Sequence, residues 1–148
     1  EDLVSLDMVL TDVMEDLALY AKKHQVNLNG EILSVDKIPG NEVLVYRALY
    51  NIVENAVKYN REGGSVDLSL SQDKNDLIVS IKDTGIGIAK ENLDLIFEPF
   101  YRVKGQEKTE GFGLGLAMAK SFLKMHGATI TIESEPGKGS EFILKFPK

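Results

Sequence analysis

One stretch of the sequence places four side chains suited to chemistry at helical spacing: Asn51, Asn55, Lys58 and Tyr59. Their offsets of four, three and one residues put them on one broad face of a helix. An amide oxygen is a hard ligand for Mg²⁺, which usually keeps several waters and shares phosphate oxygens. A lysine beside it neutralises phosphate as a point charge. The face therefore predicts a site that holds a magnesium ion and a phosphate chain.

Two glycine-rich segments complement this face. Residues 83–88, Asp-Thr-Gly-Ile-Gly-Ile, directly follow a predicted strand, and residues 111–117, Gly-Phe-Gly-Leu-Gly-Leu-Ala, directly precede a predicted helix. Glycines let the backbone approach a ligand, and a helix N-terminus presents unpaired N–H groups to an anion. Asp83 only accepts hydrogen bonds, so it would pair with a donor such as the exocyclic amine of adenine. Each glycine pattern alone is weak evidence, and the sequence contains no P-loop motif.

Hydrophobic periodicity predicts the elements that position these residues. Apolar residues at helical spacing predict helices over 3–24, 41–59 and 115–125, the second capped by Asn41 and the third ended by Gly127. Alternating residues predict a hairpin of 66–70 with 77–81 and a closing strand pair of 129–134 with 140–146, while 26–33 suggests a short strand or turn. We expect an α+β two-layer sandwich, in which about three helices cover one face of a mixed, mostly antiparallel sheet.

Composition narrows the class of protein. The 148 residues, 43% of them hydrophobic, suit one domain with a core, and no apolar run is long enough to span a bilayer. The net charge of −6 argues against a nucleic-acid binder, and the lack of cysteine excludes disulfides and thiolate metal sites. Because the sequence begins at Glu1, we expect residues 1–148 to be a single cytoplasmic domain of a larger protein, itself a candidate for anchoring in the inner membrane.

The order of these pieces resembles the catalytic and ATP-binding domain of bacterial sensor histidine kinases, part of the GHKL superfamily with the Bergerat fold. Four motifs carry the resemblance: an N box at 51–59, a first glycine box at 83–87, an F box (Phe-Glu-Pro-Phe-Tyr-Arg) at 97–102 and a second glycine box at 111–116. Residues 126–127 and 137–140 also fit the family's last strands. Four motifs in the family's order make the match specific, and it implies ATP as substrate together with Mg²⁺.

The resemblance implies a role for each polar residue of the N and F boxes. Asn55 would bind the magnesium ion through its amide oxygen, and Asn51 would support the metal and the phosphates. Lys58 would contact the phosphates, and Arg102 would lie near the terminal phosphate. These four residues form the expected catalytic set.

The resemblance also implies an adenine pocket and a mobile ATP lid. Tyr59 would lie against the adenine, Asp83 would receive its amine, and Gly87 would give the base close access. Residues 89–113 would form the lid, with Gly113 and Gly115 shaping its closing hinge. Phe112 stands where the family more often has a small or hydroxyl-bearing residue, which we expect to alter lid packing. The expected nucleotide-binding residues are Asn51, Asn55, Lys58, Tyr59, Asp83, Gly85, Gly87, Ile88, Gly111, Phe112, Gly113, Leu114, Gly115, Leu116 and Ser140.

The phosphate acceptor is expected outside this chain. Neither His24 nor His126 is followed by an acidic residue, as the family's phosphoacceptor motif requires. Related ATP hydrolases have a glutamate where Asn51 stands, and an amide does not usefully accept a proton from water. We therefore expect weak hydrolysis and transfer of the γ-phosphate to a histidine on the dimerisation and phosphoacceptor helices of a dimeric parent kinase, with a response-regulator receiver domain downstream. Residues 1–5 would be a linker remnant, and the isolated domain would be monomeric.

Other interpretations stay open from sequence alone. Tyr59 also suits a core position, Asp83 a turn aspartate and Arg102 a surface arginine. Within the superfamily, an ATP-driven machine such as DNA gyrase B or an anti-sigma serine kinase shares much of the pattern. Asp83-Thr84-Gly85 also matches the tripeptide of aspartic proteases, which need a second such carboxylate. A non-catalytic nucleotide sensor is a further hypothesis.

Overall fold

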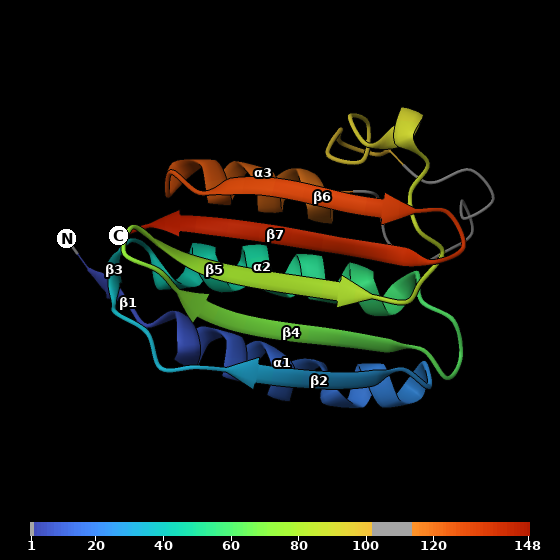
Figure 1. Ribbon diagram of the computed structural model, residues 1–148, viewed down its shortest axis with the longest axis horizontal. Helices are drawn as coiled ribbons and strands as arrows, with labels where there is room; N and C mark the ends of the chain where they lie inside the picture. The colour runs from blue at the N-terminus through green and yellow to red at the C-terminus, as the bar shows by residue number, and fades with distance from the viewer. Residues whose placement is uncertain (1, 102–113) are drawn as a thin grey trace.

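The computed structural model describes residues 2–101 and 114–148, which form two stacked layers (Figure 1). Figure 1 shows helices α1, α2 and α3 on the same side of the main sheet, which confirms the predicted α+β sandwich. The elements in chain order are β1 Leu3–Val4, α1 Leu6–Lys23, β2 Asn27–Ile32, β3 Ile38–Pro39, α2 Glu42–Lys58, β4 Ser65–Gln72, β5 Asp76–Asp83, the 3₁₀ turn η1 Lys90–Asn92, α3 Gly115–Met125, β6 Thr129–Glu135 and β7 Gly139–Pro147.

The main sheet has five strands in the order β2-β4-β5-β7-β6. Strand β2 runs parallel to β4, and the other neighbours are antiparallel. Strand β7 therefore lies between β5 and β6, and its register with β5 places Asp83 opposite Ser140. As a result, the segment that follows β5 meets the turn between β6 and β7 at one end of the sheet (Figure 1).

Helix α2 is fixed at its start and along one side. The Asn41 Oδ1 atom accepts a hydrogen bond from the Leu44 N–H at 3.1 Å, which caps the first turn. A stripe of apolar side chains on the sheet side is buried: Val45, Ala48, Leu49, Ile52, Val53, Ala56 and Val57. This orientation leaves Asn51, Asn55 and Lys58 half-buried along the edge of that stripe.

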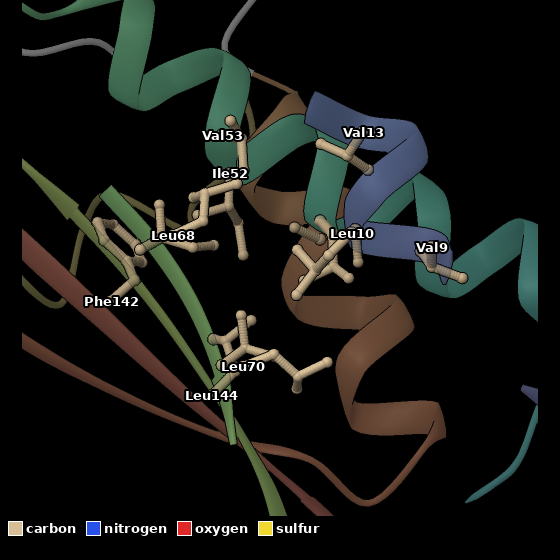
Figure 2. Packing of buried hydrophobic residues seen from close by; sticks show 14 of the residues in the cluster. Val9, Leu10, Val13, Ile52, Val53, Leu68, Leu70, Phe142 and Leu144 are labelled. Atoms are coloured by element: carbon tan, nitrogen blue, oxygen red, sulfur yellow. The ribbon is translucent and has the colours of Figure 1, made fainter. Parts of the chain in front are cut away.

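The core lies between the three helices and the sheet. Figure 2 shows Leu10 of α1 and Ile52 of α2 facing strand residues of the sheet. The labelled residues, all members of one buried cluster, are Val9, Leu10, Val13, Ile52, Val53, Leu68, Leu70, Phe142 and Leu144. Each is at most 7% exposed, and full burial of one such side chain stabilises the fold by about 1.5–3 kcal/mol. This packed core holds α2 against the sheet and thereby keeps the polar edge of α2 in place.

Near the N-terminus, one local prediction differs from the structure and one open alternative is resolved. The helix expected from residue 3 begins at Leu6, because Leu3–Val4 is extended and pairs with Ile38–Pro39. Val4 is 1% exposed, so this short pairing is part of the folded domain. The ambiguous segment 26–33 contains strand β2, which extends the sheet through its parallel pairing with β4. Among the described residues, no helix is both long and apolar enough to cross a membrane.

Candidate functional site: a cleft between α2, α3 and the end of β5

A cleft of about 210 Å³ opens beside the C-terminal half of α2. Its other boundaries are the segment after β5, the start of α3 and the first half of β7. The described residues that line it are Ile52, Glu54, Asn55, Ala56, Lys58, Tyr59, Asp83, Ile86, Gly87, Ile88, Ile96, Tyr101, Leu114, Gly115, Leu116, Ser140 and Phe142. The cleft thus brings together residues from the N box, both glycine boxes and the last strand.

The α2 wall carries three of the four residues of the polar face expected from the sequence. Asn55, Lys58 and Tyr59 line the cleft together with Glu54. The Lys58 ammonium lies 5.8 Å from the centroid of the Tyr59 ring, in cation–π range. Tyr59 is the C-terminal cap residue of α2, so it lies where the chain leaves the helix and continues towards β4. This wall combines an amide oxygen, a cation and an aromatic face.

Asp83 lies at the buried end of the cleft. It is 9% exposed, and its Oδ1 atom accepts hydrogen bonds from the Gly85 N–H at 2.8 Å and the Ser140 N–H at 3.3 Å. Burial raises the pKa of the Asp83 carboxyl above its ordinary value, and these two backbone hydrogen bonds oppose that rise. Both of these hydrogen bonds reach Oδ1. In the described part of the chain, every side-chain oxygen that is shut off from solvent has a hydrogen-bond partner. The Oδ2 atom is therefore accessible from the cleft as a hydrogen-bond acceptor.

The glycines of the first glycine box are required by the protein's own backbone. A Cβ atom on Gly87, whose φ is +72°, would lie 2.1 Å from the Glu135 carbonyl oxygen. A Cβ atom on Gly85 would lie 2.6 Å from the Tyr59 carbonyl oxygen. The loop after β5 is thus pressed against the end of α2 on one side and the β6–β7 turn on the other. These contacts account for both glycines without a ligand.

The start of α3 presents its N-terminus to the cleft. Leu114, Gly115 and Leu116 line the cleft, and the N-cap residue Leu114 makes no side-chain capping bond. The first turn of α3 contains no acidic residue. A Cβ atom on Gly115 would lie 3.7 Å from the Asn51 Cβ atom, an ordinary contact. This helix start therefore has the N–H groups, the dipole and the space to receive an anion.

Apolar side chains that the motif analysis did not select complete the walls. Ile52, Ile96 and Phe142 line the cleft, and the Phe97 ring packs edge-on against Phe142 with centroids 6.5 Å apart. The Lys120 ammonium of α3 lies 5.3 Å from the Phe97 centroid. The alternation of apolar and polar residues along β7 indicates that Phe142 faces the helices. Only the tertiary fold brings Phe142 into the same cleft as Ile96. These contacts attach the F-box segment to α3 and the sheet.

The structure brings together most, but not all, of the predicted site residues. Ten of the residues expected to bind nucleotide line the cleft: Asn55, Lys58, Tyr59, Asp83, Gly87, Ile88, Leu114, Gly115, Leu116 and Ser140. Asn51 and Gly85 are not among the lining residues; the Asn51 Nδ2 group instead donates to the Gly115 carbonyl at 3.1 Å. Arg102, Gly111, Phe112 and Gly113 lie outside the described residues.

The donor set fits a metal ion that shares its ligands with a phosphate chain. Among the described residues, no group of three or more His, Cys, Asp or Glu side chains is placed to hold a metal ion. Asn55 offers an amide oxygen in the cleft, beside the Lys58 ammonium. Mg²⁺ is commonly held in this way, by one or two protein oxygens, several waters and substrate phosphates.

Comparisons with known proteins agree with this geometry. Residues 40–148 match the family described as histidine kinase-, DNA gyrase B- and HSP90-like ATPases. The sensor histidine kinase RppB of Synechocystis sp. is 37% identical over 148 residues, which cover 98% of this chain and 33% of RppB. The mycobacterial sensor histidine kinase MprB has the same fold, with a TM-score of 0.86 and 24% identity over 99% of this chain and 96% of that chain.

One similar structure contains a nucleotide analogue. Full-length ShkA in complex with AMPPNP aligns with a TM-score of 0.84 and 29% identity, over 99% of this chain and 30% of that chain. The present chain spans about a third of the length of the curated relatives it matches.

Proposed function

This chain belongs to the family of histidine kinase-, DNA gyrase B- and HSP90-like ATPases, and we propose that it is the catalytic domain that supplies the γ-phosphate of Mg-ATP to a histidine of a sensor kinase. The observation that carries the proposal is the polarity of one cleft. A buried carboxylate lies at one end, and an amide, an ammonium and a helix N-terminus lie along its walls. This arrangement suits a base with an exocyclic amine joined to a chain of phosphates.

The base and the phosphates would be held by different groups. Asp83 would accept the adenine amine through Oδ2, while Ile88, Ile96 and Phe142 provide apolar surface for the ring. Lys58 and the N–H groups at the start of α3 would attract the phosphates. Mg²⁺ held through Asn55 would neutralise phosphate charge when bound. Residues 89–113 are proposed to close over this site as the ATP lid.

Two residues that do not line the cleft, Asn51 and His126, support transfer to an acceptor outside this chain. Asn51 is bonded through its amide to the Gly115 carbonyl, so it ties α2 to α3 and offers no carboxylate to activate water. Both ring nitrogens of His126 are also engaged, with the Phe122 carbonyl at 2.7 Å and the Asn41 N–H at 3.0 Å. His126 thus has a structural role at the end of α3. These features support an acceptor histidine on another domain.

An exposed apolar stripe along α3 and its N-cap residue is where we expect that domain to dock. Leu114, Met118 and Met125 are 37%, 41% and 68% exposed, and offsets of four and seven residues align them on one face. Phe100 is 69% exposed in the segment that follows η1. An amphipathic helix that carries the phosphoacceptor histidine would cover such a stripe beside the open cleft. About two thirds of the length of the relatives lies outside this chain and is the proposed source of that helix.

The proposal is tested with the isolated chain by ATP calorimetry and by incubation with γ-labelled ATP. We expect the chain to bind Mg-ATP, to lose adenine nucleotide affinity on Asp83→Ala while keeping its affinity for free triphosphate, and to remain unlabelled. Stoichiometric self-labelling would contradict transfer to an external histidine. Absence of ATP binding would contradict the assignment of the cleft.

A further inference from the structure

The hydroxyl of Ser134, on strand β6, uses all of its hydrogen-bonding capacity within the protein. Its Oγ atom accepts the Ile88 N–H at 2.7 Å and donates to the Gly139 carbonyl at 3.1 Å. It also lies 2.7 Å from the Oγ atom of Ser140, which lines the cleft. Ser134 itself is not among the lining residues of the cleft, so any effect on a ligand must pass through its neighbours.

Either hydroxyl of the Ser134–Ser140 pair could donate, but only one assignment of the protons makes all three contacts hydrogen bonds. A serine hydroxyl has one proton and two lone pairs. When the Ser134 proton goes to the Gly139 carbonyl, its lone pairs receive the Ile88 N–H and the Ser140 O–H. This is the arrangement in which each of the three contacts has a proton to share. The only proton of the Ser140 hydroxyl then points at Ser134, and its oxygen is left as a pure acceptor.

Ser140 also lies beside the buried carboxylate of the cleft. Its backbone N–H donates to Asp83 Oδ1, and both residues are less than one tenth exposed. The buried end of the cleft, which forms its floor, therefore presents two hydrogen-bond acceptors, Asp83 Oδ2 and Ser140 Oγ. An exocyclic amine on a purine satisfies such a floor. A carbonyl oxygen at the same position would face two acceptors and leave them unpaired, which is costly in a buried site.

We propose that Ser134 is a positioning residue that sets the base specificity of the site. By holding the Ser140 hydroxyl as an acceptor, it makes the floor select a 6-amino purine over a 6-oxo purine. The inference rests on the proposed nucleotide site. It assigns a role to a residue on an outer strand that contributes no group of its own to the cleft.

The test compares ATP with inosine triphosphate, which differs from ATP in having a 6-oxo group in place of the 6-amino group. Calorimetry with Mg²⁺ gives the ratio of their dissociation constants for the 148-residue chain and its variants. We expect ATP to bind the unmodified chain at least about tenfold more tightly. Ser134→Ala releases the Ser140 proton to donate to a carbonyl, so the ratio should fall by about fivefold to tenfold, the value of about one hydrogen bond. Ser134→Thr keeps the hydroxyl and should preserve the ratio.

A double-mutant cycle separates this role from a general structural one. In a Ser140→Ala background, Ser134→Ala should leave the ratio unchanged, because its effect acts through the Ser140 hydroxyl. Thr131→Val removes a hydroxyl from an exposed position of the same strand and should leave the ratio at its original value. Equal weakening of both nucleotides by Ser134→Ala, or the same fall in the ratio with and without Ser140, overturns the inference. If the unmodified chain binds neither nucleotide, the proposed function fails instead.

Discussion

Replacement of Gly87 by alanine is expected to destabilise the fold before any nucleotide is involved. Gly87 has a φ of +72°, and its added Cβ atom would lie 2.1 Å from the Glu135 carbonyl oxygen and 2.9 Å from the Pro136 Cα atom. Both neighbours are backbone atoms, one at the end of β6 and one in the turn that follows it. That turn is tied to the same loop, because the Gly137 N–H donates to the Ile86 carbonyl at 2.8 Å. The clash therefore has no flexible side chain to absorb it.

Gly137 provides the matched control. Its φ is +81°, but an added Cβ atom would meet no described atom within 4 Å. Alanine at either position pays the left-handed backbone strain of about 1–2 kcal/mol, partly offset by about 0.4–1 kcal/mol from a less flexible unfolded chain. Only Gly87→Ala adds the overpacking cost of about 1–3 kcal/mol. We therefore expect losses of about 1 kcal/mol for Gly137→Ala and about 3 kcal/mol for Gly87→Ala.

Urea unfolding without nucleotide measures both changes. Equal losses of unfolding free energy in the two variants would refute the contact argument. If Gly87→Ala instead kept its stability but lost ATP affinity, this glycine would be needed only to let a ligand approach the backbone, which is the role that the family resemblance implies.

Three further predictions concern the cleft and its surroundings. Gly115→Ala should keep or raise the unfolding free energy, by up to about 1 kcal/mol, because among the described residues its added Cβ atom would reach only Asn51, at an ordinary contact distance. The same substitution should lower ATP affinity, and an unchanged affinity would show that phosphates do not approach this backbone. Burial raises the pKa of Asp83 above 3.8, so the stability that the carboxyl contributes is full below pH 3.8 and is lost as pH rises through the pKa of the folded state. The gain in unfolding free energy on Asp83→Asn should therefore be larger at pH 7 than at pH 4. A gain that does not depend on pH would contradict the burial effect. Met118→Glu places a charge on the exposed stripe of α3 and should slow phosphate transfer to a separately supplied phosphoacceptor domain while ATP affinity stays constant; unaltered transfer would remove the stripe from the docking surface.

Local signals were sufficient to predict most helices and strands. Residues 115–125 were predicted as a helix, and α3 spans Gly115–Met125, because helical periodicity ends at a glycine stop. The cap at Asn41 likewise marks the start of α2. The pairing of Leu3–Val4 with Ile38–Pro39 could not be predicted, because a two-residue strand has no periodicity and depends on a distant partner.

The site was predictable where a motif carries its own chemistry. Asn55, Lys58 and Asp83 were selected for what their side chains bind, and all three line the cleft. Ile96 and Phe142 were missed as cleft walls, because an apolar side chain does not reveal from sequence which cavity it lines. The position of Asn51, bonded to the Gly115 carbonyl, depends on the packing of α3 against α2 and likewise could not be deduced from spacing. The ligand roles of these residues remain predictions.

The central claim is that the cleft holds a nucleotide and a magnesium ion together, the ion through Asn55. The most direct measurement is the ATP affinity of the unmodified chain and of Asn55→Ala, each by calorimetry with Mg²⁺ and with a chelator. Asn29→Ala, which removes a surface amide of β2 bonded to Asp67, serves as the matched control. We predict that Asn55→Ala weakens ATP binding about tenfold or more with Mg²⁺, equivalent to about 1.4 kcal/mol, and leaves it nearly unchanged in chelator. An equal loss under both conditions would contradict the metal-binding role of Asn55.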